Sequence, residues 1–424
     1  MAVKTPSLRW LIALALFLAA LLNYVDRNVL GLLAVTIQKD LHITNQEYAS
    51  VINYFLIAYT MANLLSGRIV DKLGVRMSLA FFVGWWTIAN ALTGLSQTFW
   101  QLCALRFLLG LGEAGCYTAS PKAVAERFPA PERGTVVGIY SAGGAVGATV
   151  APVLVALVAT NFGWRWVFAV TPVVAVIWIV FWLWLYKKPD PISDSNKSNS
   201  GPLTETKSAI NPAVQPPKSE LVLWITVLRE PAVWLLMLAR LITDPVWYFF
   251  QFWLPKYLQN VRGLDQKGIA NMWIIFAAAT VGFSLGGFLS GRLIRRGLAP
   301  PAARLWIMLS SACLVPLIAV IPASPTVVGV IVISVIVAYA ATAFLSNVTS
   351  LIVDIIPHHI LGTAFGVIAC GSALGGFFMN KLVAWLLDHH SYDACFYTMG
   401  LLHPLALLLL WRLRKKQTPT ECPA

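Results

Sequence analysis

Residues Trp10–Val35 read WLIALALFLAALLNYVDRNVLGLLAV, an apolar run that is interrupted by two adjacent charges, Asp26 and Arg27. The run is long enough to cross a bilayer as a helix, which takes about 20 apolar residues. Inserting each charge costs about 2.5–3.5 kcal/mol, so charged residues persist in spans where they face a cavity or a partner. Neighbouring side chains on a helix point in different directions and need different partners. We therefore interpret Asn23–Arg27 as part of a functional site; a structural ion pair that locks two helices is the alternative.

The rest of the chain shares this apolar character. Of its 424 residues, 58% are hydrophobic and 12% are charged, whereas a soluble domain has about 25% charged residues. We predict an all-α polytopic membrane protein with about twelve transmembrane helices, because the apolar runs lack the alternation of a β-barrel. The spans are predicted at 9–36, 48–70, 78–97, 99–122, 134–160, 164–186, 231–258, 269–293, 303–321, 326–356, 361–387 and 392–413.

The net charge of +13 is distributed unevenly. Most Lys and Arg residues lie at the two termini and in the loops on one side of the predicted membrane. The loops on the other side carry Lys39, Arg165, Lys256, Arg262 and Lys267. This positive-inside bias argues against a nucleic-acid partner and predicts that both termini lie in the cytoplasm. The Cys residues form no CxxC pair, and the two His pairs are predicted to lie on opposite faces, so we expect no metal site.

The predicted spans fall into two halves of six. Residues 187–219 are rich in Pro, Ser, Lys and Asn and are typical of a flexible cytoplasmic linker, which separates a bundle at 1–186 from one at 220–424. Ser66-Gly67-Arg68 closes the second span, and Ser290-Gly291-Arg292 closes the eighth. Parallel repeats of six spans with a substrate site between them are typical of transporters that alternate access to a central site. We expect two pseudo-symmetric six-helix bundles.

The loop after the second span carries a recognisable motif. Residues 67–76 read GRIVDKLGVR, which resembles the signature G-x-x-x-D-[RK]-x-G-x-[RK] of the major facilitator superfamily. Glycine permits a tight turn, and an aspartate can cap a helix or pair with Arg. We expect a cytoplasmic gate that consists of Gly67, Asp71, Lys72, Gly74 and Arg76; simple anchoring of a basic loop is the alternative. The second copy, GRLIRRG at 291–297, lacks the aspartate, so the main latch is expected in the first half.

The fourth span carries a second motif of the same superfamily. Residues 106–114 read RFLLGLGEA and match the pattern R-x-x-x-G-x-G-x-A. Arg106 and Glu113 are seven residues apart, so they share one helix face at a separation of about 10.5 Å. The same stretch contains GxGxxG, but a dinucleotide fold requires a preceding strand. We reject that interpretation because this motif lies inside an apolar helix.

The pattern as a whole resembles the anion:cation symporter family, and the seventh span, residues 240–257 (RLITDPVWYFFQFWLPKY), is similar to its hexuronate-transporter branch. The resemblance implies the major facilitator fold and symport of organic anions with protons across the bacterial inner membrane. Guanidinium binds carboxylate in bidentate geometry, so Arg27 is expected to bind the substrate. Asp26 and Glu113 match the acidic positions of the family and are expected, with Arg106, to couple transport to protons. Tyr24 and Tyr59 match substrate-binding positions; aromatic packing is their alternative role.

The second half offers polar groups without an assigned role. We expect Trp247, Tyr248, Gln251 and Asn347 to contact the substrate, with Ser346 and Ser372 as further candidates, and core packing or helix association is the alternative for each. Arg240 and Asp244 are expected to form an internal i,i+4 ion pair. Asp354 is expected to end the tenth span at the cytoplasmic face. Gly144 stands where some relatives place a polar contact, so the far end of the sugar would be recognised differently.

These expectations describe a monomeric, proton-coupled importer of an organic monocarboxylate, with glucuronate or galacturonate as first choice. An aldonate or an aromatic carboxylate is the neighbouring alternative. Drug–proton antiport is weaker, because the Gly-Pro-rich motif of antiporters is only poorly matched in the fifth span and Arg27 favours an anion. A non-transporting sensor on the same fold stays open. A membrane enzyme would need a nucleophile with its base or clustered ligands, so we expect no catalytic residue and no cofactor besides the coupling proton.

Overall fold

The computed structural model describes residues 6–128, 130–186, 220–357 and 360–414, and its regular structure in these ranges is helical. The first half comprises α1 (Pro6–Leu32), α2 (Ala34–Leu41), α3 (Asn45–Thr93), α4 (Phe99–Arg127), α5 (Ala130–Phe162) and α6 (Trp164–Leu185). The second half comprises α7 (Glu220–Arg229), α8 (Pro231–Phe252), α9 (Leu254–Asn260), η2 (Gly268–Met272), α10 (Trp273–Arg295), α11 (Pro300–Leu314), η3 (Val315–Val320), α12 (Val327–Ile355), α13 (Leu361–His389) and α14 (Tyr392–Arg414). The predicted linker at 187–219 lies outside the described residues.

The twelve-helix prediction is confirmed, although the helices do not map one to one onto spans. Within the described residues, ten helices are long and apolar enough to cross a membrane by those criteria alone. The long helix α3 holds two spans, which meet at Gly74, where φ is +73°. The helix α4 is long enough but carries the buried charges Arg106 and Glu113, which lower its mean hydropathy.

The first and the seventh predicted spans end before the predicted residue. The first was predicted to run to residue 36, but α1 ends at Leu32. The seventh was predicted to reach 258, but α8 ends at Phe252 and α9 starts again at Leu254. Pro255 explains the second break, because proline has no N–H to donate to the carbonyl four residues earlier and its ring clashes with that carbonyl.

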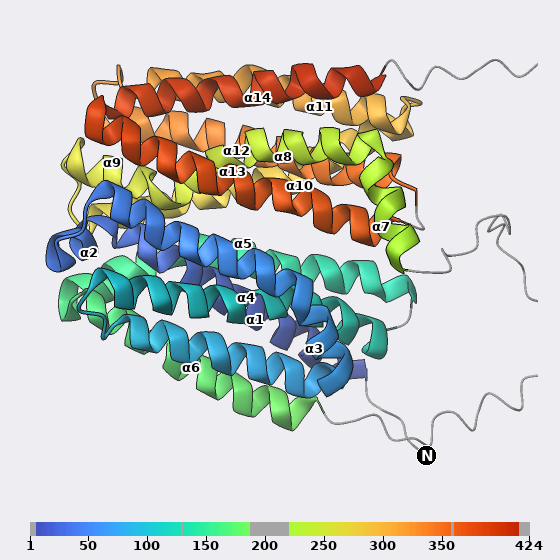
Figure 1. Ribbon diagram of the computed structural model, residues 1–424, viewed down its shortest axis with the longest axis horizontal. Coiled ribbons are helices and arrows are strands. Elements are labelled where there is room, and N and C mark those ends of the chain that lie inside the picture. The colour runs from blue at the N-terminus through green and yellow to red at the C-terminus, as the bar shows by residue number, and fades with distance from the viewer. Residues whose placement is uncertain (1–5, 129, 187–219, 358–359, 415–424) are drawn as a thin grey trace, which may run out of the picture.

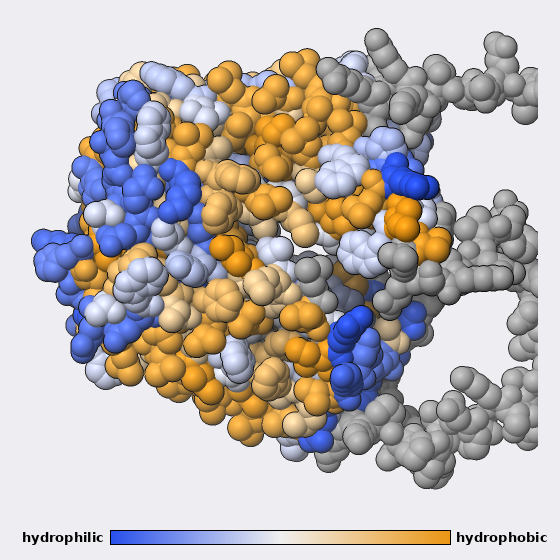
Figure 2. Space-filling model, viewed as in Figure 1, coloured by the Kyte–Doolittle hydropathy of each residue, from blue (hydrophilic) through white to orange (hydrophobic). Residues whose placement is uncertain are grey.

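The two halves lie side by side with their helices roughly parallel to one long direction (Figure 1). We call the end at which α1 begins and α14 ends the proximal end, and the end that carries α2 and α9 the distal end. The helices α1, α3 and α5 of the first half contact α8, α13 and α10 of the second half. Figure 2 shows a broad apolar surface between hydrophilic ends, and a hollow between the halves toward the proximal end.

Helix contacts across each half are made close by glycine. A Cβ on Gly143 or Gly147 of α5 would lie 2.1 Å or 2.3 Å from a backbone oxygen of α1. A Cβ on Gly371 or Gly375 of α13 would lie 2.2 Å from a backbone oxygen of α8. Only glycine permits such approach, and small residues at helix interfaces are typical of membrane bundles. These contacts fix α1 and α8, the helices on which the candidate site stands.

Candidate functional site

The centre of the first half contains an ion pair between α1 and α4. Arg27 Nε donates to Glu113 Oε2 at 2.8 Å, and its Nη2 lies 2.8 Å from the same oxygen. The Glu113 side chain is 0% exposed and that of Arg27 is 14% exposed. Glu113 Oε1 has no hydrogen-bond partner among the described residues. The structure therefore joins two residues that the sequence placed in separate roles, substrate binding and proton coupling.

Aromatic rings surround the Arg27 guanidinium. Its central carbon lies 5.1 Å from the ring centroid of Tyr24, 5.5 Å from that of Phe55 and 4.7 Å from that of Tyr59. Cation–π contacts of this kind stabilise a guanidinium away from bulk water. Tyr24 and Tyr59 thus face the predicted anion-binding group. Phe55 was missed, although it stands one helical turn before Tyr59 on α3 and that spacing predicts a shared face.

Asp26 points into the interior of the first bundle, to a different set of partners. It is 1% exposed, and its Oδ1 accepts a hydrogen bond of 2.8 Å from Asn90 of α3. Asn90 also donates to Thr171 of α6 at 3.0 Å. The prediction that the two adjacent charges have different partners is confirmed. Asn90 and Thr171 were missed, because a single polar residue in an apolar run does not reveal its neighbour.

Arg106 lies on the distal side of this group. It is 2% exposed, and its guanidinium stands 5.6 Å from the ring centroid of Phe168. Its Nε and Nη2 have no hydrogen-bond partner among the described residues. Arg106 and Arg27 line a cavity of about 10 Å³, closed by Phe55 and Phe252 among others. Such a cavity holds about one water molecule, so the centre is packed shut on this side.

Gly144 of α5 stands directly behind Tyr24. A Cβ at this position would lie 2.9 Å from the ring of Tyr24 and 3.2 Å from the hydroxyl of Tyr117. The glycine therefore gives the Tyr24 ring its place against α5, next to Arg27. The space beside Gly144 is therefore filled by the Tyr24 ring and the Tyr117 hydroxyl.

In the second half, Tyr248 is the predicted residue that faces the first half most clearly. Its hydroxyl hydrogen-bonds with Ser372 of α13 at 3.3 Å. A Cβ on Gly376 would meet both the Tyr248 ring at 2.8 Å and Leu56 of α3 at 3.0 Å. Tyr248 therefore lies where α8, α13 and α3 meet. The other predicted residues of α8 are Trp247, whose ring lies 5.8 Å from that of Phe276, and Gln251, which is 2% exposed.

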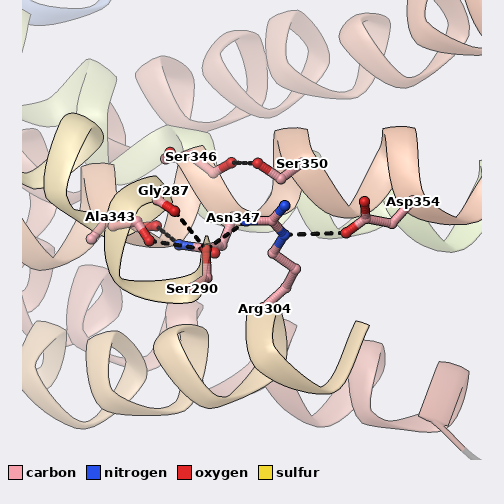
Figure 3. Close-up of polar contacts among 9 residues, drawn as sticks. Gly287, Ser290, Arg304, Ala343, Ser346, Asn347, Ser350 and Asp354 are labelled. Atoms are coloured by element: carbon pink, nitrogen blue, oxygen red, sulfur yellow. Dashed lines mark hydrogen bonds and ion pairs between the residues drawn. The ribbon is translucent and has the colours of Figure 1, made fainter. Parts of the chain in front are cut away.

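Asn347 lies elsewhere. It is 0% exposed, and its amide donates to the carbonyl of Ala343 on its own helix at 2.9 Å. Figure 3 shows it beside Ser290 of α10, inside the second bundle. Ser346 is also buried and its carbonyl accepts a hydrogen bond from Ser350. These contacts fit the alternative of helix association better than substrate contact.

The expected internal pair on α8 is present. Arg240 Nη2 lies 2.6 Å from Asp244 Oδ2, and the two side chains are 14% and 6% exposed. Asp354 lies at the end of its span, since α12 ends one residue later, and its carboxylate accepts a hydrogen bond of 3.1 Å from Arg304 (Figure 3). Its place at the cytoplasmic face stays a prediction.

The predicted gate residues lie at the proximal end. Asp71 accepts a hydrogen bond of 2.6 Å from Lys122 of α4. Gly74 provides the turn, and Arg76 donates to the carbonyl of Leu183 at 2.7 Å. Gly67 and Lys72 are exposed. The hydrogen bonds from Lys122 to Asp71 and from Arg76 to Leu183 both lie within the first half, so a latch between the halves stays a prediction.

Hydrogen bonds join the two halves at the distal end. Asn380 of α13 donates to Asn53 of α3 at 3.0 Å, and Asn53 donates to the carbonyl of Phe377 at 3.1 Å. Nearer the surface, Lys381 donates to Ser50 at 2.7 Å. The bonded distal end and the hollow at the proximal end describe a molecule that is closed distally and open proximally (Figure 2).

Comparison with known proteins identifies the family. The model of the Major Facilitator Superfamily matches residues 16–379 and 325–423. The hexuronate transporter of Escherichia coli (strain K12) is 26% identical over 99% of this chain and 96% of its own length. The galacturonate transporter of Dickeya chrysanthemi is 29% identical over 68% of this chain and 82% of its own length.

The fold comparison agrees. A bacterial homologue of the human lysosomal transporter Spinster superposes with a TM-score of 0.73 at 18% identity, covering 96% of each chain. The chain belongs to the Major Facilitator Superfamily and is a multi-pass membrane transporter rather than an enzyme.

Proposed function

We propose that the protein is a proton-coupled symporter that imports an organic monocarboxylate, with the hexuronates glucuronate and galacturonate as first choice. The observation that carries the proposal is the ion pair between Arg27 and Glu113, which stands at the centre between aromatic side chains. The resemblance to transporters named for hexuronate and galacturonate supports the substrate class.

The ion pair explains how substrate and proton would be coupled. While Glu113 is ionised, its carboxylate occupies the guanidinium of Arg27. A proton on Glu113 removes that competing charge, and Arg27 is then able to bind the carboxylate of the substrate in bidentate geometry. Loss of the substrate allows the pair to re-form and expels the proton. Binding of the proton therefore favours binding of the substrate, and binding of the substrate favours binding of the proton to the same extent.

Asp26 and Arg106 would set the charge balance of the same centre. Asp26 is held by Asn90 within the first bundle, and Arg106 has guanidinium nitrogens without a partner in the described residues. We assign Asp26 as a second proton-carrying group and Arg106 as the cation that offsets it. The proton is the only co-reactant that this mechanism needs.

The sugar end of the substrate would meet the second half. Tyr248 and Ser372 offer hydroxyl groups, and Trp247 offers an aromatic face. Tyr24 and Tyr59 would hold the carboxylate end beside Arg27. We place the protein in the bacterial inner membrane as a monomer, with the proximal end and both termini in the cytoplasm, as the positive-inside bias favours.

The experiment is uptake of labelled glucuronate and galacturonate into proteoliposomes with and without an inward proton gradient. Accumulation that a protonophore abolishes is the expected result. A folded protein that takes up neither compound would refute the hexuronate assignment, and uptake that ignores the proton gradient would refute the coupling.

A further inference from the structure

A polar hollow of about 380 Å³ lies at the distal end, between the two halves. Its wall comes from α2, α3, α9 and α13 and includes Gln38, Lys39, Asn45, Lys256, Asn260 and Asp388. Its volume is in the range of small-molecule sites, which measure about 300–1,000 Å³. The central residues assigned above do not line it.

Lys256 is the buried cation of this hollow. It lies on α9, beyond the end of the α8 span, and is 5% exposed. Its ammonium stands 5.7 Å and 5.6 Å from the ring centroids of Tyr48 and Trp253 and donates a hydrogen bond to Asn45 Oδ1. Burial lowers the pKa of Lys256 to about 8, and nearby Asp388 acts in the opposite direction. At neutral pH the group is therefore mainly protonated.

The partner of Lys256 belongs to the other half. Asn45 of α3 accepts from Lys256 and donates to Asp388 of α13 at 2.9 Å, so one neutral amide is held between two opposite charges. A carboxylate is a stronger acceptor for an ammonium group than an amide carbonyl is. An anion in the hollow would compete with Asn45 for Lys256, and the exposed Lys39 on the facing wall adds a second positive charge.

A second cation, Lys381, lies at the same interface between α3 and α13, nearer to the centre of the molecule. Lys381 lies seven residues before Asp388 on α13, about 10.5 Å deeper along the helix. It donates to Ser50 of α3, five residues beyond Asn45. An anion that leaves the hollow when α3 and α13 separate would therefore meet Lys381 before it meets Arg27.

We infer that this hollow is an external capture site for the carboxylate of the transported anion, with Lys256 as its main ligand, and that occupancy there weakens the Asn45 contact that helps close the distal end. The inference rests on the proposed transport of a hydroxylated monocarboxylate and adds a second binding site to it.

The test is the rate at which a membrane-impermeant maleimide labels Asn260→Cys, in a protein whose other cysteines are replaced by serine. Asn260 lines the hollow and is exposed. Glucuronate should slow the labelling in the otherwise native protein and also when Arg27→Ala has removed the central site. D-glucose, which lacks the carboxylate, should not. The exposed Gln97→Cys, at the same end and outside the hollow, serves as the control reporter.

The role of Lys256 is tested by charge variants in the same assay. Lys256→Gln should raise the half-protecting concentration of glucuronate about tenfold, the effect of losing one charge-assisted hydrogen bond. Lys256→Arg should restore most of the protection. Lys267→Gln removes an exposed distal charge outside the hollow and should change nothing.

Two results would overturn the inference: protection that vanishes with Arg27→Ala, or a Lys256→Gln protein that behaves like Lys267→Gln. Melting temperatures of the purified variants establish that each is folded. Uptake measured on the same proteoliposomes separates the two proposals. Uptake without protection refutes the capture site alone, and protection without uptake supports the site while refuting the transport of glucuronate.

Discussion

The two halves of the molecule share a scaffold and differ in charge. In the first half, α5 packs on α1 through Gly143 and Gly147, and in the second, α13 packs on α8 through Gly371 and Gly375. A Cβ added to any of these four glycines would lie between 2.1 Å and 2.3 Å from a backbone oxygen of the facing helix. The internal repeat is therefore visible in the contacts that set the position of the central helices.

Residues of the candidate site also occupy equivalent positions in the two halves. Tyr24 rests on Gly144, and Tyr248 rests on Gly376, with Cβ-to-ring distances of 2.9 Å and 2.8 Å. Three residues after each tyrosine, the first half has Arg27 and the second half has Gln251. Arg27 forms a buried ion pair with another helix, whereas Gln251 is buried on a face that Gly31 of α1 approaches closely.

The two halves would therefore have different roles in the proposed transport. One half would bind the carboxylate and the proton, because it holds Arg27, Glu113 and Asp26 within one group of helices. The other half would bind the neutral part of the substrate through hydroxyl and aromatic groups. Its own charged pair, Arg240 and Asp244, is satisfied internally on α8.

The largest expected effect comes from replacing Arg27 by the residue at the equivalent position of the second half. Arg27→Gln gives the first half the residue of the second half and should lower the kcat/KM of hexuronate uptake by about a hundredfold or more, because it removes a buried charged partner. Gln251→Ala should lower it by less than about tenfold. Initial rates of uptake in proteoliposomes check both, and equal losses would contradict the division of labour.

Variants of the proposed proton-coupling residues should still exchange substrate across the membrane but should no longer accumulate it. Glu113→Gln keeps the shape of the side chain and cannot be ionised, so Arg27 would stay available to the substrate. We expect counterflow exchange of glucuronate to continue while concentration driven by a proton gradient is lost. Asp26→Asn should act in the same direction. A Glu113→Gln protein that still accumulates substrate with the proton gradient would refute its coupling role.

Because glycines allow the same close helix contact in both halves, replacing one glycine in either half should destabilise the protein by a similar amount. Gly147→Ala and Gly375→Ala place a Cβ about equally close to a backbone oxygen of α1 and of α8, at 2.3 Å and 2.2 Å. Each should destabilise the folded protein by about 1–3 kcal/mol, the usual cost of overpacking. Thermal melting in detergent measures this. Gly138→Ala on α5, where a Cβ meets nothing within 4 Å, is the matched control.

The smallest effect concerns the tyrosines. Gly144→Ala would press on the Tyr24 ring and Gly376→Ala on the Tyr248 ring. We expect each to raise the KM for uptake several-fold at most, because a small ring shift costs little compared with a lost charge. Only Gly144→Ala should also alter how uptake depends on proton concentration. A proton dependence altered by both variants would argue that the halves share the coupling.

The sequence predicted the fold well, because apolar runs report directly on membrane spans. It predicted the separate partners of Asp26 and Arg27, since adjacent residues on a helix cannot face the same way. The helix break at Trp253 was missed although Pro255 signals it, because the apolar run continues past both residues. An apolar run shows that a segment lies in the membrane and does not show where its helix ends.

The site was predictable only where charge or family resemblance marked a residue. Asn90 and Thr171 became visible as partners of Asp26 through contacts between distant helices, which no spacing rule encodes. Asn347 is the opposite case. A polar residue in a span suggests a function, but this amide bonds to its own helix inside the second bundle, so its contact with substrate stays a prediction.

The most direct test of the central claim is proton movement that accompanies substrate in the absence of any imposed proton gradient. Glucuronate added outside proteoliposomes that contain a trapped pH dye should acidify their interior with the native protein. The account predicts no acidification with Glu113→Gln, although that protein still exchanges labelled glucuronate. Equal acidification by the native protein and by Glu113→Gln would contradict the claim that the proton travels on the carboxylate that competes for Arg27.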